Sequence, residues 1–217
     1  WVNAMLKVGV IGCGTMGQLH SAIFKKLPGV ELAAVADLDD QRRQEAADAL
    51  GVKTYREGQE LIADPSIDLV DIAVPTDGHA GLLDQAIKAD KHVFCEKPVV
   101  RTNAECDLLE KLAIQTGKRI GVGHVVRFAP EYVAARDKVL AGDIGRAAVS
   151  RTFRGGSQFP KGWQDWYADY ARSGGVILDL AIHDIDYLRW CFGDVARVYA
   201  KTTQGLTEER MEHAFIV

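Results

Sequence analysis

The chain has 217 residues, of which 47% are apolar, and a formal net charge of −4, so it can bury a sizeable hydrophobic core. The slightly acidic balance argues against a nucleic-acid-binding surface, and no apolar run approaches the roughly 20 residues that span a bilayer. The four cysteines form no C-x-x-C pair and indicate neither a disulfide framework nor a metal site, which favours a cytoplasmic protein. We expect residues 1–4 to be foreign to the protein and Met5 to be its natural start.

The first expected element is a strand over residues 6–11, which leads into the pattern Gly-x-Gly-x-x-Gly and then a helix over residues 18–26. In a dinucleotide-binding loop each glycine would have a task. Gly12 would take the tight turn, Gly14 would let the backbone approach a pyrophosphate, and Gly17 would let the helix pack closely on the sheet. The pyrophosphate would lie on the free N–H groups at the start of the helix. Glycines at these spacings also occur in plain tight turns.

A second apolar run ends at Asp37, where an acidic residue would bind the adenosine ribose. An acid at this place favours NAD because it would repel the 2′-phosphate of NADP, whereas the nearby Arg42 and Arg43 leave NADP open. Helices and strands then alternate, which predicts a parallel sheet covered on both faces over residues 5–123, with ligands beyond the carboxyl ends of its strands. We expect helices over residues 40–50 and 58–63, up to residue 89, and from Thr102 or Asn103 to residue 116, and strands over residues 31–36, 52–55, 69–74, 92–95 and 119–123.

The pattern changes after about residue 124, and residues 124–217 are expected to form an α+β domain with an open sheet. Because a domain seldom ends on an exposed strand edge, we expect this domain to be cut short at its C-terminus. Its expected elements are helices over residues 130–140 and 176–192, strands over residues 147–154, 195–203 and 215–217, and an irregular, aromatic-rich segment over residues 155–175.

Glu96-Lys97-Pro98 follows the strand expected over residues 92–95. A turn at this proline could aim the Lys97 ammonium across the mouth of the sheet, where it could hold a substrate hydroxyl and stabilise negative charge on its oxygen. The tripeptide by itself is more typical of a surface lysine in a proline turn.

Asp179 and His183 are four residues apart in an expected helix and therefore project from the same face. A carboxylate beside an imidazole raises its basicity and fixes its orientation, as a general base near neutral pH requires. A solvated surface pair is the alternative interpretation, and a metal site is a weaker one because the spacing places no third ligand.

Taken in order, five features resemble the Gfo/Idh/MocA family of NAD(P)-dependent oxidoreductases, within which the inositol 2-dehydrogenases are most similar. They are the glycine loop, Asp37, Ala73-Val-Pro-Thr76 with His79, Glu96-Lys97-Pro98, and Asp179-x-x-x-His183. The resemblance implies a Rossmann domain followed by an α/β domain whose large open, mostly antiparallel sheet commonly builds a homo-oligomer interface, in a dimer or tetramer. This chain falls short of the usual family length, so part of that sheet is expected to be absent.

The resemblance also assigns roles to individual residues. Three of them match the family's catalytic positions: Lys97, Asp179 and His183. The implied reaction transfers a hydride from a secondary alcohol of a sugar or cyclitol to NAD(P), while His183, oriented by Asp179, takes the hydroxyl proton and Lys97 holds the oxygen. The other residues would hold the cofactor: Gly12, Thr15, Met16 and Gly17 at the pyrophosphate, Asp37 at the ribose, Val74 and Pro75 along the cofactor cleft, and Glu96 and Lys97 near the nicotinamide, with a cis Lys97–Pro98 bond.

The aromatic-rich segment suggests the type of substrate. Trp166, with Trp163, Tyr167 and Tyr170, could cover the apolar face of a sugar or cyclitol ring, and core packing under a long loop is an equal alternative. Arg127, with Arg154 and Arg172, could bind hydroxyls or a carboxylate. Two other functions stay open: an NAD-dependent glycoside hydrolase of the same family, and a non-catalytic NAD(P)-binding sugar sensor, which would be expected to lack the Lys–Asp–His set.

Overall fold

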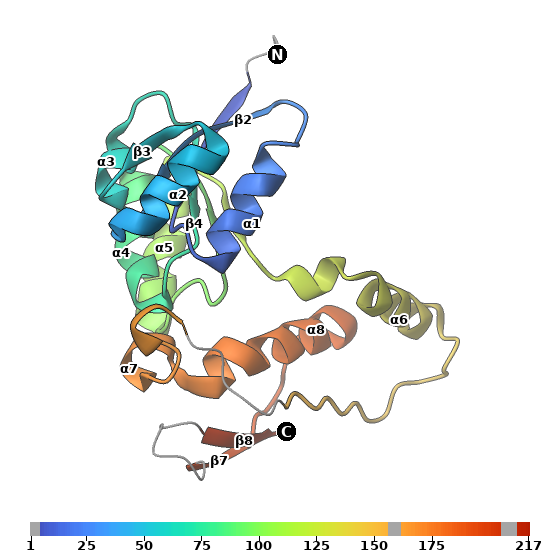
Figure 1. The fold of residues 1–217 in the computed structure, drawn as a ribbon. Helices are drawn as coiled ribbons and strands as arrows, with labels where there is room; N and C mark the ends of the chain where they lie inside the picture. Colours follow the sequence, from blue (N-terminus) through green and yellow to red (C-terminus); the bar gives the residue numbers. More distant parts are fainter. Residues whose placement is uncertain (1–4, 156–161, 205–211) are drawn as a thin grey trace. The chain divides into compact units, whose positions relative to one another are not determined.

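The computed structural model describes residues 5–155, 162–204 and 212–217, and the chain divides into two compact units, residues 1–123 and 124–217 (Figure 1). Two sequence expectations concern residues outside this description. They are the foreign leader at residues 1–4 and the part of the aromatic-rich segment at residues 156–161. Each unit is described by itself below.

The first unit is a six-stranded parallel sheet with helices along the chain between its strands, which confirms the expected Rossmann fold. The strand order is β3-β2-β1-β4-β5-β6, so the direction of winding reverses between β1 and β4, where ligands bind in folds of this type. The strands are β1 (Leu6–Ile11), β2 (Val30–Ala36), β3 (Lys53–Tyr55), β4 (Leu69–Ile72), β5 (His92–Cys95) and β6 (Ile120–Val122). The helices are α1 (Thr15–Phe24), α2 (Asp40–Leu50), α3 (Gly58–Ala63), α4 (His79–Lys88) and α5 (Asn103–Thr116).

Local signals in the sequence explain where several of these helices begin and end. Asp39 accepts hydrogen bonds from the first backbone N–H groups of α2, and Gly51 ends that helix with a φ of 66°. Thr102 caps α5 in a reciprocal capping box with Glu105, and Gly117 ends it in the left-handed conformation. These ends lie where the sequence analysis expected them.

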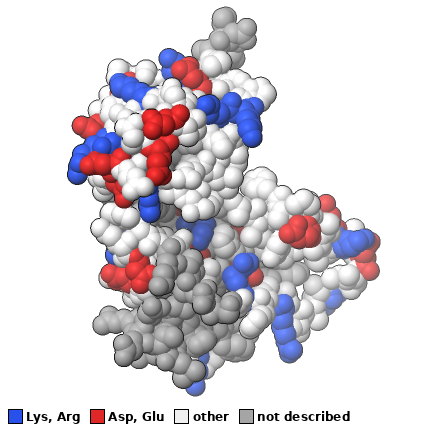
Figure 2. All heavy atoms as spheres, viewed as in Figure 1, with Lys and Arg blue, Asp and Glu red and all other residues white. Residues whose placement is uncertain are grey.

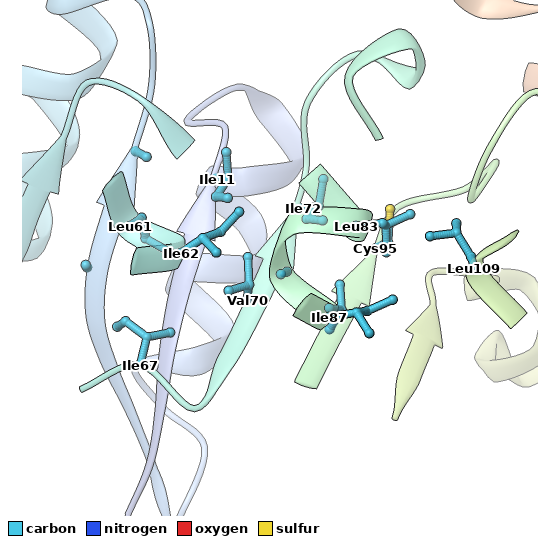
Figure 3. Close-up of a cluster of buried hydrophobic side chains, with 14 of the residues drawn as sticks. Ile11, Leu61, Ile62, Ile67, Val70, Ile72, Leu83, Ile87, Cys95 and Leu109 are labelled. Atoms are coloured by element: carbon cyan, nitrogen blue, oxygen red, sulfur yellow. The ribbon is translucent and has the colours of Figure 1, made fainter. Parts of the chain in front are cut away.

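One of two buried hydrophobic clusters of the first unit lies between the sheet and the helices α3, α4 and α5 (Figure 3). Leu61, Leu83 and Ile87 are fully buried from the helices, and Val70 and Ile72 are fully buried from β4. Fully burying one such side chain contributes about 1.5–3 kcal/mol, so this cluster fixes the sheet rigidly beneath its loops. The residues that follow the carboxyl ends of the strands are therefore held in fixed positions.

The second unit combines helices with one strand pair. Its elements are α6 (Pro130–Ala141), α7 (Tyr170–Ser173), a π-helical turn (Ile177–Ala181) that continues into α8 (Ile182–Phe192), and the antiparallel strands β7 (Ala200–Gln204) and β8 (Glu212–Ile216). Aromatic contacts join α6 to α8: the rings of Tyr132 and Tyr187 meet edge to face at 5.0 Å, and the Arg136 guanidinium lies 4.3 Å from the Trp190 ring.

Two expected elements of the second unit differ from the structure. Residues 147–154 form no strand, because no described segment pairs with their backbone, and their side chains are exposed. The expected strand over residues 195–203 begins only at Ala200, directly after the residue, Tyr199, whose backbone exchanges two hydrogen bonds with Val217 at the end of the partner segment. The β-rich composition of these segments therefore indicated extended chain, but extended chain becomes a strand only beside a partner.

On the face seen in Figure 2, positive and negative side chains are interspersed over the first unit. Arg43 and Arg56 both pair with Asp40, for example. Within the described part of the chain, no helix has the length and apolar character needed to cross a membrane.

Candidate active site

The glycine loop joins β1 to α1, and two of its glycines are required by the fold itself. Gly12 has a φ of +99°, and a Cβ there would lie 2.4 Å from the Ala73 carbonyl oxygen. A Cβ on Gly17 would lie 1.7 Å from the Gly12 carbonyl oxygen, so only glycine lets α1 start this close to the turn.

Gly14 differs from its two neighbours in the loop. Among the described residues, a Cβ at this position would have only the Arg42 guanidinium as a neighbour, at 4.0 Å. Gly14 is also the N-cap of α1, where it has no side chain to accept from the free N–H groups of the first turn. The space and the N–H groups at Gly14 therefore suit an anionic ligand approaching the backbone.

Asp37 follows β2 and lies against the same loop. Its Oδ2 accepts a hydrogen bond from the Cys13 backbone N–H at 2.6 Å, and its Oδ1 accepts one from the Asp39 N–H at 2.8 Å. The carboxylate is thus held in one orientation by the backbone of the glycine loop and of the turn before α2. Burial and the nearby Asp37 charge raise the pKa of the Cys13 thiol to about 12, so this cysteine stays a neutral side chain.

The ends of β4 and β5 are tied together by a buried histidine. His79, at the start of α4, is 1% exposed, and its ring nitrogens lie 2.8 Å from the Pro98 carbonyl oxygen and 2.9 Å from that of Val74. Burial outweighs these two contacts and lowers the pKa of His79. The Val74-Pro75 segment, expected to line the cofactor cleft, is therefore fixed to the Glu96-Lys97-Pro98 turn.

The Lys97–Pro98 peptide bond is cis, as the resemblance implied. The backbone N–H of Lys97 donates to Oε2 of the Glu96 side chain at 3.2 Å. Glu96 itself is 8% exposed, and its backbone N–H donates to the Ile72 carbonyl oxygen of β4. Lys97 thus lies two residues beyond the carboxyl end of β5, beside the segment with Val74 that follows β4.

A buried charge cluster beneath this turn was missed by the sequence analysis. His20 of α1 lies 2.8 Å from Asp71 Oδ2 through Nδ1 and 3.3 Å from Glu96 Oε1 through Nε2. Burial alone would lower the pKa of His20, but the hydrogen bonds and charges of Asp71 and Glu96 outweigh it and raise the pKa to about 9. One signal was present in the sequence: an aspartate interrupts the apolar run Leu-Val-Asp-Ile of β4.

In the second unit, Asp179 and His183 lie on one continuous helical segment that changes its winding between them. Asp179 is 2% exposed within the π-helical turn, and His183 is the second residue of α8. Such π turns are rare and frequently mark functional sites. The helix expected over residues 176–192 is present, and its first part, Ile177–Ala181, is wound as a π-helix instead of an α-helix.

The residues expected to contact substrate also lie in the second unit. Arg127 makes a two-point ion pair with Asp186, with N–O distances of 2.8 and 2.6 Å, so its guanidinium already has a carboxylate partner. Trp166 stacks on Tyr167 with ring centroids 4.0 Å apart and is half-buried. Arg154 pairs with Asp184 in the same way as Arg127 pairs with Asp186.

The first unit fits a dinucleotide on its own geometry. The open side of Gly14, the uncapped start of α1 and the fixed Asp37 carboxylate lie together where the strand order reverses. Among the described residues, no group of three His, Cys, Asp or Glu side chains could hold a metal ion.

Comparison with known proteins agrees with this geometry. Residues 6–124 match the model of an oxidoreductase family with an NAD-binding Rossmann fold, and residues 132–217 match the GFO/IDH/MocA C-terminal domain. Myo-inositol 2-dehydrogenase of Thermotoga maritima is 34% identical over 94% of this chain and 60% of the relative. The scyllo-inositol 2-dehydrogenase (NAD(+)) of Bacillus subtilis is 30% identical over 87% of this chain and 54% of the relative.

A solved structure, that of myo-inositol 2-dehydrogenase from Lactobacillus plantarum, superimposes with a TM-score of 0.77 at 30% identity. The match covers 91% of this chain and 60% of that one, so the chain spans less than two thirds of each of these relatives. Because the Rossmann model matches more than half of the chain and the C-terminal model most of the remainder, the chain belongs to the Gfo/Idh/MocA family of oxidoreductases.

Proposed function

We propose that the protein oxidises a secondary alcohol of an inositol-like cyclitol, or of a related sugar, with NAD as the hydride acceptor. The observation that supports this most directly is the carboxyl edge of the parallel sheet, where the open glycine loop, the fixed Asp37 carboxylate and the Lys97 turn follow strands β1, β2 and β5. The curated relatives named above are dehydrogenases of inositols, so they favour neither the glycoside hydrolase nor the sugar sensor.

In this proposal residues 5–123 hold the cofactor. Gly12, Gly14, Thr15, Met16 and Gly17 receive the pyrophosphate, Asp37 binds the ribose, and Val74, Pro75, Glu96 and Lys97 line the nicotinamide end. Bound NAD supplies the hydride chemistry. The Asp37 carboxylate, already oriented by two backbone N–H groups, accepts from the ribose hydroxyls without further ordering.

Residues 124–217 supply the proton transfer and contribute to the substrate site. His183 takes the hydroxyl proton as the carbonyl forms, and the buried Asp179 keeps its imidazole oriented. The Lys97 ammonium donates to the same oxygen and stabilises the negative charge that grows there. Trp166 and Tyr167 offer a stacked aromatic surface to the ring of the substrate. Arg127, which is paired with Asp186 of the same unit, binds substrate hydroxyls.

A cytoplasmic location and a homodimeric or homotetrameric assembly belong to the same proposal. All four cysteines are free, as a reducing compartment would keep them. Several apolar side chains of the second unit are largely exposed, Phe128 at 82% and Phe153 at 95%, which is surface that a subunit interface could cover. Light scattering on the complete protein would measure the assembly.

Turnover of the complete protein tests the proposed activity. Myo-inositol, scyllo-inositol, aldoses and uronates would be supplied in turn with NAD and with NADP, and absorbance of the reduced nicotinamide recorded. Accumulation with an inositol supports the proposal. Release of a sugar from a glycoside without accumulation would instead identify a hydrolase, and dinucleotide binding without either reaction would identify a sensor.

A further inference from the structure

The buried cluster of His20, Asp71 and Glu96 connects three elements beneath the Lys97 turn. His20 comes from α1, Asp71 from the middle of β4, and Glu96 from the residue after β5. The His20 ring is also held edge-on by Phe94 and Phe24, with ring centroids 5.7 and 6.5 Å away. The imidazole is therefore fixed both by charge and by packing.

Apolar side chains of similar volume could stabilise this part of the core about as well as the charged cluster does. Asp71 is fully buried, and its Oδ1 has no hydrogen-bond partner among the described residues. Removing charged groups from water is costly, and replacing a buried ion pair by apolar side chains of similar volume is often neutral or stabilising. An unsatisfied buried carboxylate oxygen in this cluster calls for a role beyond holding the core together.

The cluster contacts the candidate catalytic residue through one side chain. Glu96 Oε1 faces His20, while Oε2 of the same carboxylate accepts the Lys97 backbone N–H. The carboxylate also fills the space next to Gly123, where a Cβ would approach Oε1 to 3.0 Å. Any movement of the Glu96 carboxylate therefore shifts an acceptor of the Lys97 backbone.

The geometry points to His20 as a positioning residue that acts through Glu96 to hold the Lys97 backbone in the orientation that aims its ammonium at the substrate oxygen. This inference rests on the proposed function, in which Lys97 binds that oxygen. Asp71 Oδ2 holds the opposite side of the imidazole through its hydrogen bond with Nδ1 of His20. Because the ring is held between the Asp71 carboxylate on β4 and the Glu96 carboxylate after β5, it transmits the rigidity of the central strand β4 to the turn after β5.

The charges in the cluster are consistent with this role. Burial alone would raise the pKa of Glu96, but His20 and, to a lesser extent, Lys97 hold it below the usual value, so Glu96 is a carboxylate. His20 is protonated at neutral pH, so its Nδ1 donates to Asp71 Oδ2 and its Nε2 forms an ion pair with Glu96 Oε1 at 3.3 Å. A glutamine at position 20 keeps much of the side-chain volume but loses the charge and one of the two fixed donor directions.

The first test does not depend on activity. Amide hydrogen exchange in the complete protein would be compared between wild type and His20→Gln. We expect the Lys97 amide to exchange about tenfold faster or more in the variant, because its acceptor is released, while the amides of β1 and β4 keep their protection. Unchanged exchange at Lys97 would overturn the inference. If His20→Gln alone leaves Asp71 unpaired and unfolds the protein, the double variant His20→Gln/Asp71→Asn removes both charges together and is measured in its place.

The second test is kinetic. We expect His20→Gln to lower kcat by up to about 10²-fold while changing the Kd for NAD less than about threefold, since small misplacements of a reacting group cost rate more than ground-state binding. In a Lys97→Ala background the same substitution should cost nothing further, because the group that it positions is gone. An equal loss in both backgrounds, or wild-type kcat in His20→Gln, would refute the role.

A matched control comes from the other end of β5. Lys91 is also buried and polar, and its Nζ donates to the carbonyl oxygens of Asp64 and Ile67 at 2.9 and 2.7 Å. Lys91→Met should lower the melting temperature but leave kcat and the Lys97 amide unchanged. If the complete wild-type protein turns over no polyol, the proposed function is refuted. The hydrogen-exchange experiment would still decide whether His20 holds the Lys97 backbone in place.

Discussion

Replacing Gly14 by alanine should weaken dinucleotide binding without unfolding the protein. Gly14 has φ −72° and ψ −167°, extended angles that alanine adopts, and within the part of the chain that the structure describes its Cβ would have only Arg42 as a neighbour, at 4.0 Å. Alanine is a poorer N-cap than glycine, but it also restricts the unfolded chain, and these two effects of about 0.5–1 kcal/mol offset each other. We therefore expect the free energy of unfolding to change by less than about 0.5 kcal/mol.

The Kd for NAD should rise at least about tenfold in Gly14→Ala, a loss of about 1.4 kcal/mol. The reason is that the new methyl group occupies the space through which a pyrophosphate would approach the backbone. Titration calorimetry with NAD and thermal melts of the same preparations would measure both quantities. Wild-type affinity in Gly14→Ala would refute the assignment of this space to the cofactor.

Gly12→Ala is the matched control two residues away. Its φ of +99° imposes strain of about 1–3 kcal/mol on alanine, and the Cβ would also meet the Ala73 carbonyl oxygen at 2.4 Å. Each kcal/mol lowers the melting temperature of a chain of this size by about 2–4 °C. Gly12→Ala should therefore lose stability, whereas Gly14→Ala should lose affinity. Equal losses of stability in the two variants would show that the loop is only a packed turn.

Three further predictions concern the reaction. Lys97→Ala should keep NAD affinity but lose about 10²-fold or more in kcat, and near-wild-type turnover would make Lys97 an ordinary surface lysine. His183→Ala should lose about 10²–10⁴-fold in rate, and wild-type rates in this variant would leave Lys97 as the leading proton acceptor. Asp179→Asn should keep the fold but shift the acidic limb of the pH–rate profile. Values of kcat/KM should be higher with NAD than with NADP because of Asp37, and a clear preference for NADP would contradict this.

The first unit could be predicted closely from the sequence because its signals are local. Asp39, Thr102 and the glycines Gly51 and Gly117 define helix ends through bonds within a few residues. The strand β5 and the helices α2, α3 and α5 begin and end at the expected residues. Each element carries its own cap or apolar run, so neighbouring elements need not be known in advance.

The second unit was harder to predict because its structure depends on partners distant in the sequence. Residues 147–154 have the composition of a strand, but no described segment pairs with them. Arg127, expected at the substrate, has Asp186 as its partner 59 residues away, a pair that no local spacing indicates. The π turn around Asp179 has no sequence signature that separates it from an α-helix of the same composition.

Local patterns likewise could not show which residues contact His20, since Asp71 and Glu96 lie 51 and 76 residues further along the chain. The observed cluster predicts that the stability of the protein depends on pH. The folded pKa of His20, about 9, lies above the unfolded value of 6.5, so its contribution is complete below about pH 6.5 and is lost as the pH rises towards 9. The shift in the pKa of His20 corresponds to a stabilisation of the folded state by about 3 kcal/mol at most. The net contribution of the cluster is smaller at neutral pH, because burial raises the pKa of Asp71 and so makes its charged form unfavourable in the folded state. Urea unfolding at several pH values between about 6 and 9 should therefore show stability falling in wild type and a flatter profile in His20→Gln. Parallel profiles for the two proteins would mean that His20 is not charged in the folded state.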